Sequence, residues 1–114
     1  PSQAARLEGK EVDIETLKIP HHNHKPLIIE GVGGILTPLN DKHLFIDLLK
    51  IWKVPVVLVS RSTLGTINHT LLTVKALRAE NIDILGIIFN GPKNTLNKDS
   101  IEHFSKVPVI AEMT

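Results

Sequence analysis

The stretch that decides the fold is VPVVLVSRSTLGTINHTLLTVKALRAENIDILGIIFNG, residues 54–91. Two of its segments, 56–60 and 84–90, are continuous apolar runs rich in β-branched residues, which is typical of buried strands. The segment between them carries apolar residues at helical spacing, namely Ile67, Leu71, Val74 and Leu77. Thr66 is a candidate N-cap for this helix and Asn81 a candidate C-cap. The strand-helix-strand order predicts two parallel strands.

The same alternation continues on both sides of this stretch. Upstream, 26–30 is an apolar run that predicts another strand, and a helix capped by Asn40 or Asp41 is expected to reach about Lys53. Downstream of the turn at Gly91-Pro92, a short helix near 99–106 precedes a last strand at 107–111. The predicted fold class is α/β, a parallel sheet with helices on both faces.

The residues before this core read as a lead-in. Residues 1–25 carry helix and loop signals, with Asp13 as a possible cap, and 26–112 form the β-α-β-α-β-α-β core. The chain of 114 residues fits one domain in length. Because it starts at Pro1 and not at a methionine, we expect it to be a piece of a longer protein.

Composition excludes several classes of protein. Hydrophobic residues at 42% and charged residues at 22% are ordinary for a globular domain, which argues against a disordered chain. The absence of cysteine excludes a disulfide scaffold, a thiolate zinc site and a cysteine nucleophile. The net charge of +1 without runs of like charge, together with only 4% aromatic residues, argues against nucleic-acid and membrane partners. With no apolar run long enough for a membrane span and no signal peptide pattern, we expect a cytoplasmic location.

Three predicted strands end in polar residues, namely Glu30, Ser60 and Asn90. Ligands of open α/β sheets bind beyond the carboxyl ends of the strands, so these ends predict a binding site. A carboxylate such as Glu30 suits Mg²⁺, and the glycines of 31–34 allow backbone N–H groups to approach a phosphate. The alternative is a tight turn with a solvated glutamate. No G-x-x-x-x-G-K-[ST] loop occurs in the chain.

Two further motifs have both a ligand-binding and a structural interpretation. The helix start at Leu64-Gly65-Thr66, with Asn68, can receive a carboxylate or phosphate, or it can be a helix cap alone. The amide of Asn90 matches the edge of a purine, or it is a turn residue beside Gly91.

Other polar residues give weaker signals. His21, His22 and His24 match no common zinc spacing, so a solvated loop is favoured over a metal site. Ser60 and Ser62 lack the G-x-S-x-G elbow of hydrolases, which argues against a serine nucleophile.

The stretches IIEGVGGILTPLN (28–40) and 54–91 resemble the dethiobiotin synthetase family, P-loop NTPase-like enzymes of biotin synthesis. The most specific part is LGTINHTLLT (64–73), followed by EGVGG (30–34), in which the family usually has Ala at the position of Val32. The resemblance implies ATP- and Mg²⁺-dependent ring closure of 7,8-diaminopelargonate with CO2. A substrate amine forms a carbamate, ATP converts it to a carbamic-phosphate anhydride, and the second amine closes the ureido ring.

The resemblance also implies roles for individual residues. Glu30 matches the family's Mg²⁺ ligand, and Asn90, with Gly91 beside it, matches the residue that recognises adenine. The nucleotide-contacting loop corresponds to Glu30, Gly31, Val32 and Gly33. The segment that receives the substrate's carboxylate, and that serves the neighbouring subunit of a homodimer, corresponds to Leu64, Gly65, Thr66 and Asn68.

The family's phosphate loop, catalytic lysines and second Mg²⁺ ligand have no counterpart in this sequence. We therefore expect a C-terminal portion of the enzyme that contains no catalytic residue, is inactive alone and needs the N-terminal portion. A related P-loop amidase or ligase, such as a cobyrinic acid diamide synthase, remains an alternative. A non-catalytic nucleotide-binding module is another.

Overall fold

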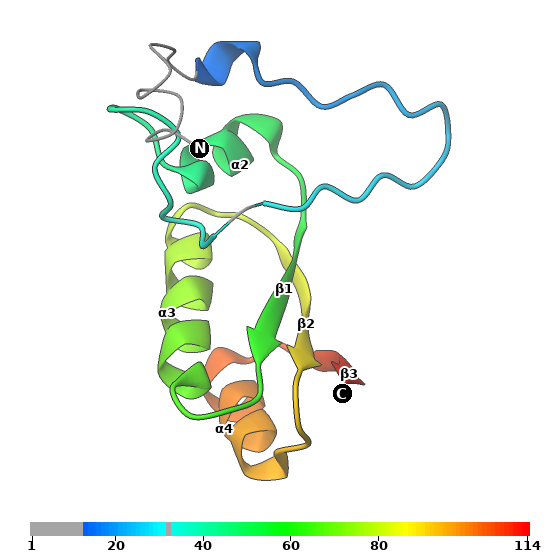
Figure 1. Cartoon of the computed structure of the whole chain (residues 1–114), viewed down its shortest axis with the longest axis vertical. Helices are drawn as coiled ribbons and strands as arrows, with labels where there is room; N and C mark the ends of the chain where they lie inside the picture. Colours follow the sequence, from blue (N-terminus) through cyan, green and yellow to red (C-terminus); the bar gives the residue numbers. More distant parts are fainter. Residues whose placement is uncertain (1–12, 32) are drawn as a thin grey trace. The chain divides into compact units, whose positions relative to one another are not determined.

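The computed structural model describes residues 13–31 and 33–114, and these divide into two compact units between Lys53 and Val54 (Figure 1). The first unit contains η1 (Ile14–Thr16) and α2 (Phe45–Trp52). The second contains, in chain order, β1 (Val56–Arg61), α3 (Thr66–Ala79), β2 (Ile84–Asn90), α4 (Thr95–Ser105) and β3 (Val109–Met113). In the described part of the chain, no helix has both the length and the apolar composition that crossing a membrane requires.

The second unit is built on a parallel sheet in the order β1-β2-β3. The register places Arg61 of β1 beside Asn90 of β2, and Asn90 beside Met113 of β3. This arrangement confirms the α/β class and the parallel strands predicted from the sequence. The last strand lies two residues later than expected, because its pairing with β2 begins at Val109, opposite Ile87, and Val107 packs in the core ahead of it.

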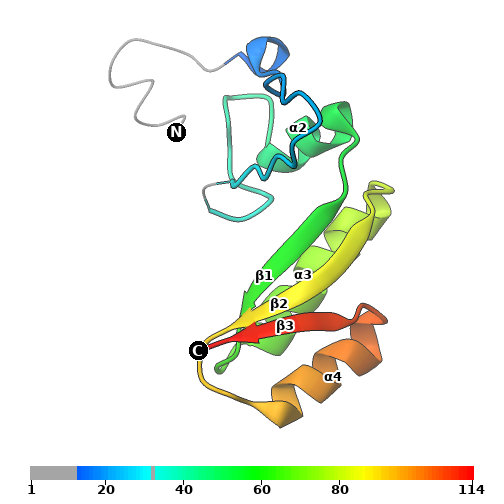
Figure 2. The ribbon, with the colours of Figure 1, turned by 90° about the vertical axis from the view of Figure 1, so that its right-hand side faces the viewer.

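Both helices of the second unit lie on the same face of its sheet (Figures 1 and 2). Under them lies the hydrophobic core, which consists of Val74, Ile87, Phe89, Ile101 and Val107. The opposite face exposes the apolar side chains of Val57, Val59, Ile110 and Met113. Within this unit, therefore, the helices expected on both faces of the sheet are present on one face only.

The helix boundaries of the second unit differ slightly from those expected. Gly65, with φ +95°, is the N-cap of α3, and Thr66 is its first helical residue and not its cap. The C-cap is Glu80, and Asn81 follows it in the left-handed conformation with φ +57°. The helix α4 starts at Thr95, earlier than expected, because the Asn94 side chain accepts the Asn97 N–H at 3.0 Å.

A chain of buried hydroxyl groups anchors the start of α3 on β1. The Thr66 hydroxyl donates to the Arg61 carbonyl and lies 3.2 Å from the hydroxyl of Thr70. The Thr70 hydroxyl donates in turn to Ser60 Oγ at 2.9 Å. All three side chains are buried, so each hydroxyl depends on its protein partners in place of water.

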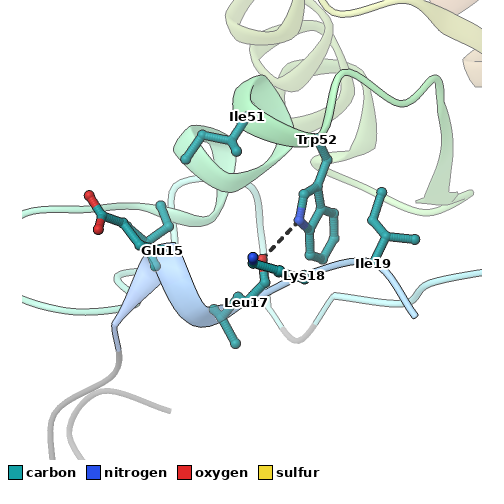
Figure 3. Close-up of a pocket in the computed structure, with 7 residues that line it drawn as sticks. Glu15, Leu17, Lys18, Ile19, Ile51 and Trp52 are labelled. Carbon is teal, nitrogen blue, oxygen red and sulfur yellow. Dashed lines mark hydrogen bonds between the residues drawn. The ribbon is translucent and has the colours of Figure 1, made fainter. Parts of the chain in front are cut away.

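The first unit packs α2 against the segment that contains η1. Asp13 caps η1 as expected, through a 3.0 Å bond from the Glu15 N–H. Ile14, Leu39 and Leu48 form the buried cluster. Trp52 Nε1 donates to the Leu17 carbonyl at 3.1 Å, beside a shallow groove of about 430 Å³ (Figure 3). This indole bond ties the end of α2 to the segment after η1.

Two expectations for the first unit are wrong. The helix α2 starts at Phe45, and its N-cap N–H, that of Leu44, donates to Asp47 Oδ2 at 2.8 Å. Asn40 instead accepts the N–H groups of Lys42 and His43, each at 2.8 Å, in the preceding turn. Because its side chain is already used in that turn, it does not cap the helix.

The second correction concerns residues 26–30, which form no strand. Leu27, Ile28 and Ile29 are exposed by 40%, 92% and 41%. A strand exists only through hydrogen bonds to a neighbouring strand, and no described segment pairs with this one. The apolar pattern was therefore not sufficient to form a strand in this structure.

The core predicts a large difference between two leucines of α3. Leu77 is fully buried, whereas Leu72 is 58% exposed. We expect Leu77→Ala to lower the free energy of unfolding by about 2–5 kcal/mol, because it opens a cavity. Leu72→Ala, the matched control, should change it by less than about 0.5 kcal/mol. Urea unfolding followed by circular dichroism measures both, and equal effects would contradict the assigned core.

The hydroxyl chain predicts a similar difference between two threonines of α3. Thr70→Val removes the donor to Ser60 Oγ and leaves the buried Ser60 hydroxyl without that partner, whereas Thr66 keeps its bond to the Arg61 carbonyl, so the change should cost about 1–3 kcal/mol of unfolding free energy. Within the part of the chain that the structure describes, the Thr73 hydroxyl bonds only to the His69 carbonyl in the preceding turn. Thr73→Val is therefore the control and should be nearly neutral in the same urea experiment. A neutral Thr70→Val would show that the hydroxyls do not stabilise the start of α3.

Candidate functional site

The candidate site of the second unit lies where its three parallel strands end. Asn90 is the last residue of β2, and its side chain is exposed. Arg61 and Met113, the residues paired with it in β1 and β3, are exposed as well. Because the strands are parallel, their carboxyl ends meet at this edge, which is where open α/β sheets bind ligands. The structure therefore keeps Asn90 as a candidate binding residue.

Ser60, the second predicted polar strand end, is not available to a ligand in this structure. It is 7% exposed and pairs in register with Phe89. Its hydroxyl accepts the bond from Thr70 on the face that α3 covers. Its polarity is explained by this buried contact.

The turn after Asn90 is fixed by close packing. Gly91 has φ +141°, and a Cβ built on it would lie 2.6 Å from Ser62 Oγ, so this position requires glycine. The Gly91 N–H donates to the Met113 carbonyl at 2.7 Å. These contacts hold the backbone beside Asn90 at the edge of the sheet.

Ser62 and Asn97 are two residues of this region whose role sequence reasoning missed. Ser62 is 1% exposed, and its hydroxyl has no hydrogen-bond partner among the described residues. Asn97 Nδ2, in the first turn of α4, donates to the Ser62 carbonyl at 2.9 Å. This contact spans 35 positions in sequence, so no local pattern could have indicated it.

The start of α3 lies at exposed residues. Leu64, Gly65 and Asn68 are exposed, and no side chain of the described residues caps the helix. Thr66 differs from them, since its side chain is 3% exposed and its N–H donates to the Thr63 carbonyl at 3.1 Å. An anion at this helix end would therefore meet the exposed residues and not the Thr66 hydroxyl.

Glu30 and the glycine loop belong to the first unit. The Glu30 side chain is exposed. A Cβ on Gly31 would lie 2.7 Å from the Phe45 ring, and one on Gly33, which has φ +82°, would lie 2.5 Å from Thr37 Oγ1. Both positions therefore need glycine for close packing. Val32, also predicted to contact nucleotide, lies outside the described residues.

The three histidines lie on an exposed segment of the first unit. His21 Nε2 is hydrogen bonded to Asn23 Oδ1, and His22 Nδ1 is 2.9 Å from the Lys25 carbonyl. Over residues 13–31 and 33–114, no group of three or more histidine, aspartate or glutamate side chains has a geometry that could hold a metal ion.

Known proteins resemble the chain over nearly its whole length. A relative from Paramagnetospirillum magneticum, an "ATP-dependent dethiobiotin synthetase BioD", is 46% identical over 99% of this chain and 55% of its own length. The protein of that name from Brucella ovis is 48% identical over 94% of this chain and 50% of its own length. A "Biotin biosynthesis bifunctional protein BioCD" from Bordetella avium is 45% identical over 99% of this chain and 24% of its own length.

These matches confirm the resemblance to dethiobiotin synthetase that the motifs indicated. The chain spans about half the length of the first two relatives. The model of the family described as "AAA domain" matches residues 1–113, in agreement with the expected P-loop NTPase-like α/β fold. The chain therefore belongs to the AAA domain family.

Proposed function

We propose that this chain supplies part of a cytoplasmic enzyme that forms dethiobiotin from 7,8-diaminopelargonate, CO2 and ATP. The observation that carries the proposal is the 46–48% identity to relatives named ATP-dependent dethiobiotin synthetase. Ring closure would proceed through a carbamate and a carbamic-phosphate anhydride. The lysines and phosphate loop that the resemblance places elsewhere in the enzyme would supply the catalytic groups, and this chain would bind and orient the reactants.

Asn90 is proposed to recognise adenine. Its exposed amide offers one acceptor and two donors in a plane, which suits the donor and acceptor pair on the edge of that base. The Gly91 N–H bond to Met113 supports this role, because it limits movement of the backbone next to the amide. A positioned amide loses less conformational entropy on binding than a mobile one.

Glu30 is proposed to bind Mg²⁺, and Glu30, Gly31, Val32 and Gly33 to contact the nucleotide. The donor chemistry fits, because Mg²⁺ prefers carboxylate oxygens and phosphates and retains several waters. The exposed Glu30 side chain leaves room for those waters. Bound Mg²⁺ would neutralise phosphate charge, and the glycine loop would present N–H groups without an intervening side chain.

The start of α3 is proposed to receive the carboxylate of 7,8-diaminopelargonate, in a homodimer whose neighbouring subunit holds the reacting amines. The exposed positions Leu64, Gly65 and Asn68 support this role, because the uncapped N–H groups there and the helix dipole favour an anion. Thr66 would contribute by holding the helix start on β1 through its buried hydroxyl. Fixing the carboxylate at a distance from the amines orients the substrate chain.

The role of Asn90 predicts a loss of base selectivity on substitution. We expect Asn90→Ala to weaken ATP binding about tenfold, since it removes two hydrogen bonds to the base. GTP binding should change little, so the ratio of the two dissociation constants serves as an internal control. Isothermal titration of both nucleotides measures it, and an unchanged ratio would argue against base recognition by Asn90.

The role of Glu30 predicts a loss of metal dependence. Glu30→Gln keeps the size of the side chain and removes its charge. The factor by which Mg²⁺ tightens ATP binding should therefore be about tenfold smaller in this variant than in the unaltered chain. Glu15→Gln is a matched control, since Glu15 is an exposed carboxylate in the same unit. Titration of ATP with and without Mg²⁺ checks this, and equal effects of the two substitutions would contradict a metal site at Glu30.

A further inference from the structure

We propose that Arg61 and Met113 flank the nucleotide base that Asn90 recognises, with the Arg61 guanidinium stacked on one face of the base. The inference rests on the proposed adenine role of Asn90 and assigns two further residues to that site. It follows from the register of the sheet, in which Arg61 and Met113 are the residues paired with Asn90 on its two sides.

Residues paired in register on neighbouring strands present their side chains on the same face of a sheet. Arg61, Asn90 and Met113 therefore form a row across the carboxyl edge, and all three are exposed. The face they share is the one that α3 and α4 leave open, because Phe89, which precedes Asn90, is buried in the core beneath these helices. A ligand has access to the whole row.

The spacing of the row suits a flat ring. Neighbouring strands lie about 4.8 Å apart, so the backbones of the two outer strands are separated by about 10 Å. An aromatic ring with a contact on each face needs about 7–8 Å between the contacting atoms. Arginine and methionine have longer side chains than asparagine, so they extend beyond the central amide. A base that meets Asn90 by its edge would therefore lie between the two outer side chains.

The chemistry of the outer residues fits the two faces of a base. A planar guanidinium stacks on aromatic rings, and a methionine thioether makes favourable contacts with them. Within the described residues, neither a hydrogen bond nor an ion pair engages the Arg61 guanidinium. The nearby carboxylate of Glu112 does not compete for it, since Glu112 pairs with Phe89 on the helix-covered face and bonds to Lys98 at 3.5 Å.

The row is held in place by contacts outside it. The Asn97 amide donates to the carbonyl of Ser62, the residue after Arg61. The N–H of Gly91, the residue after Asn90, donates to the carbonyl of Met113. Each end of the row is thus tied to a neighbouring backbone, which lowers the cost of ordering it around a base.

The test compares adenosine with ATP, using the 114-residue chain labelled with ¹⁵N and the amide shift of Gly91 as the readout. Arg61→Ala should weaken the binding of both ligands by the same factor, roughly five- to tenfold, because the stacked base is common to both. Arg61→Lys should restore little of the loss, since an ammonium group has no plane. Met113→Ala, a second variant that leaves Arg61 intact, should weaken the binding of both ligands about threefold. Arg78→Ala is the control for loss of an exposed arginine, at the far end of α3.

Two results would overturn the inference. If Arg61→Ala weakens the binding of ATP but not of adenosine, and Arg61→Lys restores ATP binding, the guanidinium contacts phosphate and not the base. If Asn90→Ala weakens the binding of both ligands while Arg61→Ala and Met113→Ala leave it unchanged, Asn90 recognises the base and the flanking residues take no part. An unaltered chain that binds neither ligand would instead contradict the proposed recognition of adenine by Asn90, on which this inference rests.

Discussion

The central strand β2 sets the geometry on which the second unit depends. It pairs with β1 on one side and β3 on the other, and its residues Ile87 and Phe89 are buried beneath α3 and α4. With one face of the strand in the core and both edges hydrogen bonded, a one-residue slip would expose that apolar pair. The same constraint places Asn90 at the end of the strand with its side chain in solvent. The position of the proposed base-recognition residue thus follows from core packing.

An energetically unfavourable contact lies beside Asn90, the proposed base-recognition residue. The buried Ser62 hydroxyl lacks a partner within the described chain, which is unfavourable by about 1–3 kcal/mol relative to a satisfied group. It occupies the space that a side chain at position 91 would need, so the sharp turn after β2 depends on the pair of Ser62 and Gly91. An alanine at position 62 would avoid the cost, and nothing in the described residues explains the hydroxyl. The volume of Ser62, and not its polarity, is what the turn after β2 depends on.

Much of the second unit could be predicted from the sequence, because its signals are local. Continuous apolar runs and a helical face indicated β1, β2 and α3, and a parallel sheet followed from their order. The predicted strand at 26–30 failed because pairing is not local, and no described segment supplies the partner. Thr66 could be placed at a helix start from sequence, but its burial depends on Thr70 and Arg61 together. The row of Arg61, Asn90 and Met113 needed the register, which propensities do not contain.

We propose that this chain serves as the nucleotide- and substrate-binding portion of an ATP-dependent dethiobiotin synthetase. The most direct measurement uses a chimaera in which the chain replaces the matching stretch of the Paramagnetospirillum magneticum relative, to which it is 46% identical. Dethiobiotin formation from 7,8-diaminopelargonate, bicarbonate and MgATP is then assayed alongside the unaltered relative. We expect the chimaera to form dethiobiotin and the 114-residue chain alone to release no phosphate. A folded chimaera without product, or turnover by the isolated chain, would contradict it.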